Sequence, residues 1–314
     1  MKTKNKGENM KIVFMGTPDF ALTVLKKLYE EKHEIIAVVT QTDKPKGRGH
    51  KIQFSPVKIF ALEKNIPVLQ PKTLKDNEFV DTLKSLNADI FIVAAYGKII
   101  PENILYLTKY GSINVHASLL PKYRGAAPIH HAIINGETVT GITIMKMDKG
   151  MDTGDIILQK KCNISMDDTY ETLYNKLSKL GADALTEVIN NIDSIETKKQ
   201  DNSLATYAPM ITKDMGHIDW HKTSLEIANL IRALQPGAYT LYNDKILKIH
   251  QVENYPTYEN AECGKIIDMN KNGFAIKTSD GALAILKLQK QGGKIMSAAD
   301  YLKGHKLSTD ILFN

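Results

Sequence analysis

The sequence has few of the residues that mark several whole classes of protein. Its 314 residues include two cysteines, Cys162 and Cys263, with no CxxC pair and no neighbouring histidine pattern. This excludes a disulfide framework or a zinc site and favours a reducing cytoplasm. The longest apolar run, IFIVAAYG at 90–97, is too short to cross a bilayer, so no membrane partner is expected. The polar start, MKTKNKGENM, is neither a signal peptide nor an anchor, and we predict a disordered lead at residues 1–10.

A dinucleotide-binding glycine pattern and a strong charge excess are also missing. GTPDF at 16–20 lacks the GxGxxG spacing, so a nicotinamide or flavin cofactor is not supported. The formal charge of +6 is too small for a protein that coats nucleic acid, although a local basic surface could still meet phosphates. The 43% hydrophobic and 24% charged residues are typical of a globular protein, and the length favours two domains.

Apolar runs alternate with amphipathic helical patterns through the first half of the chain. KIVFMG at 11–16, EIIAVVT at 34–40 and DIFIVAAYG at 89–97 have the composition of buried strands. Thr17 and Pro18 follow the first run, where they are expected to supply an N-cap and a first-turn proline. The alternation predicts an α/β fold with a Rossmann-like, mostly parallel sheet, whose ligands bind at the carboxyl ends of the strands.

The pattern changes after a polar stretch, SIETKKQDNS at 194–203, which has the composition of a linker. Beyond it, five short alternating runs with Asn-Asp, Gly and Asn-Gly turns predict a small antiparallel barrel. The predicted boundaries are a first domain at 11–193, a linker at 194–213 and a second domain at 214–314.

One predicted strand, SINVHA at 112–117, ends in polar side chains. Alternation places Asn114 and His116 on one side of it, and the loop KGMDTG at 149–154 could add a carboxylate. An amide that donates to an oxyanion, a titratable imidazole and a carboxylate that orients it suit acyl transfer to an amine. The residues alone also fit a structural histidine, and any of Asp148, Asp152 and Asp155 could simply cap the turn.

A second polar segment, DKPKGRGHK at 43–51, gathers Lys44, Lys46, Arg48 and Lys51 around glycines and a proline. It fits a solvated surface loop, which is the usual setting for a run of charge. It also fits a mobile arm that meets phosphates, with the Arg48 guanidinium exposed between two glycines.

Six stretches together indicate a family: KIVFMGTPDFA, QTDKPKGRGHKIQFSPVK, VAAYGKIIP, SINVHASLLPKYRGAAPI, DKGMDTGDI and IRALQPGAYT. With them, nearly the whole chain resembles the methionyl-tRNA formyltransferase family. NxHxSLLP with a later MDTGD loop would mark only the wider group of formyltransferases that use 10-formyltetrahydrofolate. The basic loop and the second domain narrow the resemblance to the tRNA enzymes.

The resemblance implies transfer of the formyl group of 10-formyltetrahydrofolate to the amine of methionyl-initiator tRNA, which gives N-formylmethionyl-tRNA for translation initiation. It implies a catalytic set of Asn114, His116 and Asp152, and so selects Asp152 among the three aspartates. Backbone groups of VAAYG and DKGMD are implied to hold the pterin, beside folate contacts from Ser118, Leu119, Leu120 and Pro121.

For the tRNA, the resemblance implies that the loop around Arg48 enters the acceptor stem, and that the second domain is an OB-like tRNA-binding barrel. Residues 213–314 hold 13 Lys and Arg against 11 Asp and Glu, a net of +2. Phosphate binding would therefore require its lysines to gather on one face, for example Lys245, Lys248, Lys287, Lys290 and Lys294. We expect a monomer without a metal.

Two alternatives remain open. A formyltransferase acting on another amine, such as a sugar nucleotide, would share the folate site and the same three side chains, and its basic loop would be incidental. A non-catalytic nucleic-acid-binding protein would use the Rossmann-like half only as a scaffold, and it would bind no folate.

Overall fold

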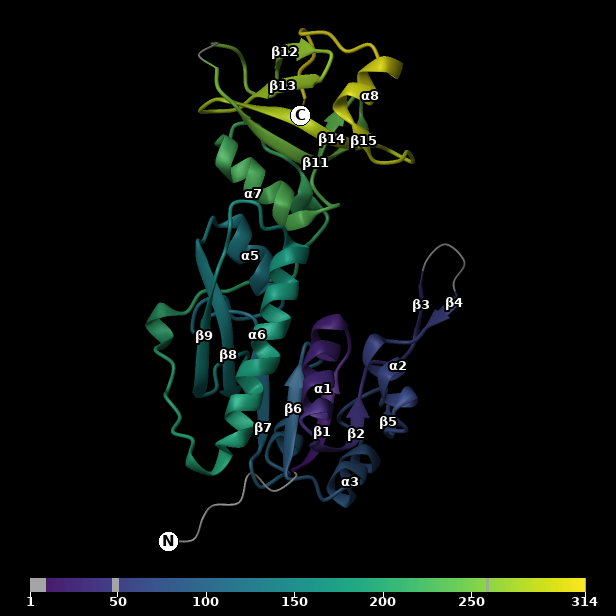
Figure 1. The fold of residues 1–314 in the computed structure, drawn as a ribbon, viewed down its shortest axis with the longest axis vertical. Helices are drawn as coiled ribbons and strands as arrows, with labels where there is room; N and C mark the ends of the chain where they lie inside the picture. The colour runs from purple at the N-terminus through teal and green to yellow at the C-terminus, as the bar shows by residue number, and fades with distance from the viewer. Residues whose placement is uncertain (1–9, 47–50, 258–259, 314) are drawn as a thin grey trace. The chain divides into compact units, whose positions relative to one another are not determined.

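The computed structural model describes residues 10–46, 51–257 and 260–313, which form two compact units (Figure 1). The first unit comprises Met1–Pro128, Val139–Asn163 and Tyr174–Pro209, and the second comprises Ile129–Thr138, Ile164–Leu173 and Met210–Asn314. Residues 129–138 and 164–173, which the predicted boundaries assign to the first domain, thus group with the second. Within that unit, Arg232 donates to the backbone oxygens of Ser165 and Asp168.

The first unit is built on a seven-stranded sheet in the order β5-β2-β1-β6-β7-β8-β9. Its strands are β1 (Lys11–Gly16), β2 (Glu34–Val39), β5 (Val68–Leu69), β6 (Ile90–Ala94), β7 (Ser112–His116), β8 (Val139–Lys146) and β9 (Ile156–Asn163). The first five pair in parallel, whereas β8 is antiparallel to β7 and β9 is antiparallel to β8. The predicted Rossmann-like, mostly parallel sheet is confirmed.

Helices cover both faces of this sheet. They are α1 (Asp19–Glu30), α2 (Pro56–Glu63), α3 (Asn77–Ser85), α4 (Glu102–Leu105) and α6 (Tyr170–Asn190), which begins in the second unit. Figure 1 shows α1 lying against β1 and β6. The other face holds an apolar cluster in which Val13 and Met15 of β1 pack with Phe79 of α3 and Ile104 of α4.

The packing of α6 fixes which way the side chains of β7 point. A methyl group on Gly181 of α6 would come within 2.9 Å of Val115 Cγ1, so the helix lies directly on that residue. Because side chains alternate along a strand, Asn114 and His116 point to the opposite face, away from α6.

The prediction for Thr17 is wrong. Helix α1 has Pro18 at its N-cap position and no side-chain cap, while the Thr17 hydroxyl donates to Tyr96 O (3.3 Å). The backbone nitrogen of Gln41 donates to the same hydroxyl (3.4 Å), and the Gln41 amide donates to Tyr96 O (3.0 Å). The hydroxyl therefore ties together the segments that follow β1, β2 and β6. Its proton goes to the Tyr96 carbonyl, and its oxygen accepts from the Gln41 nitrogen rather than from a nitrogen in the first turn of α1.

The second unit contains an antiparallel sheet in the order β10-β11-β14-β13-β12, with β15 paired to β14. Its strands are β10 (Tyr239–Tyr242), β11 (Lys245–Tyr255), β12 (Ile266–Asn270), β13 (Gly273–Lys277), β14 (Ala282–Lys290) and β15 (Met296–Ser297). The five predicted strands are confirmed and the sheet is consistent with an OB-like domain. Its helices are α5 (Pro128–Ile134), α7 (Ser224–Leu234) and α8 (Ala298–Gly304), and the sequence patterns did not predict β15 or α8.

Three short 3-10 helices complete the described elements: η1 (Ile192–Ser194), η2 (Asn202–Leu204) and η3 (Asp214–Gly216). A separate two-stranded ladder pairs β3 (Lys44–Lys46) with β4 (Lys51–Gln53). No helix in the described parts of the chain has both the length and the apolar character needed to span a membrane.

Candidate active site

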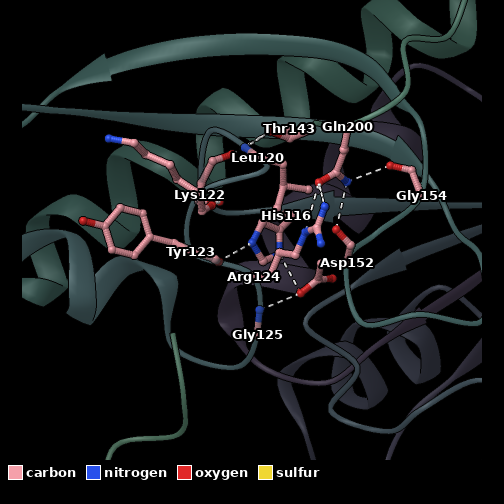
Figure 2. Close-up of polar contacts among 11 residues, drawn as sticks. His116, Leu120, Lys122, Tyr123, Arg124, Gly125, Thr143, Asp152, Gly154 and Gln200 are labelled. Atoms are coloured by element: carbon pink, nitrogen blue, oxygen red, sulfur yellow. Dashed lines mark hydrogen bonds and ion pairs between the residues drawn. The ribbon is translucent and has the colours of Figure 1, made fainter. Parts of the chain in front are cut away.

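His116 is the last residue of β7 and is buried. Its Nε2 lies 3.0 Å from the backbone oxygen of Tyr123, and its Nδ1 lies 3.6 Å from Oδ2 of Asp152 (Figure 2). Because a carbonyl can only accept, Nε2 must hold the proton of the neutral ring, which leaves Nδ1 facing the carboxylate. The 3.6 Å separation is longer than a hydrogen bond and corresponds to an ion pair when the ring is charged.

Asp152 reaches His116 from a loop that must turn back along β7. Strand β8 runs antiparallel to β7 and ends with Lys146 opposite Ile113, at the amino end of β7. Asp152 has a left-handed backbone, with φ at 53°, and its Oδ2 accepts a hydrogen bond from the Gly125 nitrogen at 2.8 Å. The carboxylate is thus held by the loop that follows His116, in a backbone conformation that is rare outside glycine.

The three aspartates of the loop have different settings. Asp148 Oδ1 accepts from the Gly150 nitrogen (3.0 Å) and the Thr153 hydroxyl (2.6 Å), so this residue caps the turn. Asp155 accepts a hydrogen bond from the Thr197 hydroxyl at 3.3 Å. Of the three, Asp152 is the one beside His116, as the family resemblance implies.

Asn114 lies two residues before His116 on the same side of β7 and is partly exposed. Within the described residues its side-chain amide makes no hydrogen bond, so both of its polar groups can meet a substrate. The structure therefore brings Asn114, His116 and Asp152 to one face of the sheet.

The SLLP segment forms a wall whose polar groups are bound within the protein. The Ser118 side chain is fully buried and donates to Lys122 O (2.6 Å), while the Leu120 nitrogen donates to the Thr143 hydroxyl (3.0 Å). The Gln159 amide donates to Leu120 O (2.8 Å). Leu119 and Pro121 are partly exposed, so these two of the four predicted folate contacts can present apolar surface to a ligand.

Lys44, Lys46 and Lys51 of the predicted arm lie in the ladder of β3 and β4. Lys44 is exposed, and Lys46 is paired with Lys51 where the two strands face each other. Arg48 lies outside the described residues.

The base of the ladder is held by a polar cluster. Lys58 Nζ pairs with Asp43, donates to Gln70 Oε1 (2.7 Å) and lies 4.0 Å from the centre of the Phe54 ring. The Gln70 amide in turn donates to Asp43 Oδ1 (3.0 Å). Burial acts to raise the pKa of Asp43, but the hydrogen bonds and the charge of Lys58 outweigh it, so this pKa lies below its usual value of 3.8.

The lysines proposed for the second domain do not share one face. Lys290 is opposite Leu247, a buried residue, whereas Lys287 precedes Leu288 and points to the other side. By the same alternation Lys245 shares the face of Leu247, Lys248 takes the opposite face, and Lys294 follows the end of β14. The condition set for phosphate binding by these five lysines is therefore not met.

Two residues next to the site are absent from the predicted site residues. They are Arg124 and Gln200, and Gln200 lies in the segment predicted to be a linker. The Gln200 side chain accepts hydrogen bonds from Arg124 and donates to the backbone beside Asp152 (Figure 2). No sequence signal pointed to Gln200, because a polar residue among KKQDNS is indistinguishable from solvated chain.

No group of three or more His, Cys, Asp or Glu side chains that could hold a metal occurs among the described residues. The donor set around His116 is instead an amide, an imidazole and a carboxylate, placed beside backbone groups and an apolar wall.

Two family models match the chain. The model for formyl transferase matches residues 10–189, and that for the formyl transferase C-terminal domain matches residues 210–306. The Rossmann-like sheet and the side chains gathered on β7 thus belong to a protein of the formyl transferase class.

Relatives narrow this class. The methionyl-tRNA formyltransferase of Caldanaerobacter subterraneus subsp. tengcongensis is 52% identical over 303 residues, which cover 95% of this chain and 98% of the relative. The enzyme of the same name from Clostridioides difficile is 46% identical over 307 residues, which cover 96% and 99%. This chain belongs to the methionyl-tRNA formyltransferase family.

A solved structure shares the fold. The crystal structure of WlaRD, a sugar 3N-formyl transferase, in the presence of dTDP and 5-N-formyl-THF, has a TM-score of 0.66 and 26% identity. It covers 92% of this chain and 100% of its own. The fold is thus also found in an enzyme that formylates a different amine.

Proposed function

We propose that this chain transfers the formyl group of 10-formyltetrahydrofolate to the α-amino group of methionyl-initiator tRNA, giving N-formylmethionyl-tRNA. The principal observation is the buried His116 ring, held between Tyr123 O and the Asp152 carboxylate beside Asn114. The names and high identity of the relatives support the choice of acceptor.

In this proposal the amine nitrogen attacks the formyl carbon on N10 of the folate. A C–N bond forms, and the carbonyl oxygen becomes an oxyanion to which the Asn114 amide donates. The bond from carbon to N10 then breaks, N10 takes up a proton, and the attacking nitrogen gives one up.

Protons move at the Nδ1 side of His116. Because Tyr123 O holds Nε2, a charged ring offers its Nδ1 proton to the oxyanion and then to the departing N10. Asp152 orients the ring, stabilises its charge and assists removal of the amine proton through water. Leu119 and Pro121 form the apolar wall for the folate, Ser118 and Leu120 shape their loop, and backbone groups of 94–97 and 148–152 hold the pterin.

Parts of the protein other than the residues around His116 bind the tRNA. The arm around Arg48, with Lys44, Lys46 and Lys51, enters the acceptor stem. The OB-like domain provides a second tRNA surface, although the five lysines considered above share no single face of it. The enzyme works in the cytoplasm as a monomer, which light scattering after size-exclusion chromatography would test.

The deciding experiment measures formyl transfer from 10-formyltetrahydrofolate to charged initiator tRNA, with an amino-sugar nucleotide as the rival acceptor. The wild type is expected to formylate the tRNA. His116→Ala is expected to lose turnover while still binding folate, and Arg48→Ala to lose mainly selectivity for the initiator tRNA. Transfer to the amino sugar but not to tRNA would replace the proposed acceptor, and failure to bind folate would favour a non-catalytic protein.

A further inference from the structure

Gln200 links the two loops that hold the site, and it does so from a third segment of the chain. Its Nε2 donates to the backbone oxygens of Asp152 (2.8 Å) and Gly154 (2.7 Å). Its Oε1 accepts from Nε (3.1 Å) and Nη2 (2.7 Å) of Arg124. Figure 2 shows this amide between the guanidinium and the loop of Asp152. One side chain therefore uses its full donor capacity on one loop and its acceptor on the other.

The segment that presents Gln200 is itself fixed on both sides. Before it, Lys198 exchanges two backbone hydrogen bonds of 2.8 Å with Ile156, at the start of β9. After it, the Arg124 nitrogen donates to Thr206 O (2.9 Å) and the Ala208 nitrogen donates to Arg124 O (2.7 Å). The position of the amide is thus set by the backbone rather than by side-chain freedom.

Arg124 depends on this amide. The residue is 2% exposed, and in the described structure its guanidinium has amide oxygens rather than a carboxylate as partners. These are Oε1 of Gln200 and Oδ1 of Asn202, the latter at 2.8 Å from Nη2. A buried cation without its acceptors is costly, so the guanidinium holds Gln200 in place as firmly as Gln200 holds the guanidinium.

We infer that Gln200 is a positioning residue for formyl transfer, acting through Asp152. The inference rests on the proposed function. The Asp152 backbone is in the left-handed region, and its carboxylate takes one hydrogen bond from Gly125, the residue after Arg124. Gln200 joins the same two loops at neighbouring points, the Asp152 carbonyl and the Arg124 side chain. It therefore sets the separation between the carboxylate and Nδ1 of His116, which a proton transfer depends on.

Gln200→Glu tests the donor side of this amide separately from its acceptor side. The carboxylate still accepts from Arg124, but an oxygen now replaces the donor that faces the carbonyls of Asp152 and Gly154. We expect kcat for tRNA formylation to fall about tenfold or more, with the KM values for both substrates within about twofold of wild type. Gln200→Met, of similar length, removes both halves and is expected to lose at least as much. The matched control is Ser203→Ala, which removes a hydroxyl that donates to Asp201 on the same segment.

A double-mutant cycle with Asp152→Asn separates positioning from general loss of structure. If Gln200 acts through Asp152, Gln200→Glu costs less than about a further twofold once the carboxylate is gone. The inference is overturned if the two losses multiply, or if Gln200→Glu retains wild-type kcat. Melting temperatures of all variants show whether each one folds. If Gln200→Glu does not fold, Gln200→Met takes its place in the cycle.

A second test of the role of Gln200 is structural and does not need the tRNA that accepts the formyl group. In a crystal structure of Gln200→Glu we expect Asp152 Oδ2 to have moved out of ion-pair range of His116 Nδ1, and an unchanged separation would overturn the inference. If the wild type formylates no tRNA, the proposed acceptor is wrong, while this structural result still decides the role of Gln200.

Discussion

The loops around His116 and the β3 and β4 ladder differ in how they are fixed. The loop of Gly125 and the loop of Asp152 are hydrogen-bonded to each other and to the segment 198–208, through both side chains and backbone. The ladder is secured at the Asp43 end by the cluster of Lys58, Gln70 and Phe54. Proton transfer needs groups fixed to fractions of an ångström, whereas contact with phosphates tolerates a surface that adjusts to its partner.

The largest effect is expected where the chemistry is concentrated. Asp152→Asn keeps the size of the side chain and an oxygen for the Gly125 nitrogen but removes the charge beside His116. We expect kcat to fall roughly 10²- to 10⁴-fold, the range typical of acid–base groups, with little change in KM. Single-turnover formylation measures this, with Asp155→Asn as control, and a loss shared by both variants would contradict a role specific to Asp152.

The next effect tests how closely the loops must fit. Gly125 has φ at 116°, and a methyl group there would lie 2.8 Å from Ala208 O. Gly125→Ala should shift the nitrogen that Asp152 accepts from and lower kcat about tenfold or more. Gly111→Ala is the matched control, because φ is 70° there but the nearest atom is 3.6 Å from the added carbon. Equal losses in both variants would attribute the effect to backbone strain alone.

A smaller and different effect is expected at the ladder. Lys58→Met removes the ion pair with Asp43 and leaves the ladder with less support. We expect the KM for tRNA to rise about fivefold, or about 1 kcal/mol, with kcat and the folate KM nearly unchanged. Lys64→Met, beside Tyr29 and Phe60, is the control. A fall in kcat with unchanged tRNA KM would remove the distinction between the two regions.

The smallest effect concerns pH and the second unit. Burial first, and the charge of His131 second, lower the pKa of His130 from 6.5 to about 4, and its ring stacks on Tyr170 at 3.9 Å. Between these two values the unfolded chain binds a proton that the folded chain does not. Protonation of the unfolded chain at His130 therefore leaves the stability of the fold unchanged above pH 6.5. It lowers that stability progressively as the pH falls from 6.5 towards 4. His130→Phe should narrow the difference in melting temperature between pH 7.5 and pH 5, and an unchanged difference would contradict this reasoning.

The sheet was predictable because short apolar runs such as KIVFMG and DIFIVAAYG alternate with amphipathic helical patterns, and this combination favours buried parallel strands. The pairing of Asn114 with His116 followed from alternation along one strand. The approach of Asp152 did not, because it depends on how far an antiparallel hairpin loop turns back along its neighbour. Gln200 was out of reach for the same reason: its four hydrogen bonds join segments about 46 to 76 positions apart.

The backbone and the side chain of Tyr96 differ in how their polar groups are satisfied. Its carbonyl accepts from Thr17 and Gln41, yet its buried hydroxyl has no partner among the described residues, and burial raises its pKa to about 12. An unsatisfied buried hydroxyl costs about 1–3 kcal/mol, which Tyr96→Phe would recover without touching the carbonyl. Removing this one oxygen would thus raise the thermal stability of the chain and leave more room for further mutation beside His116 and Asp152.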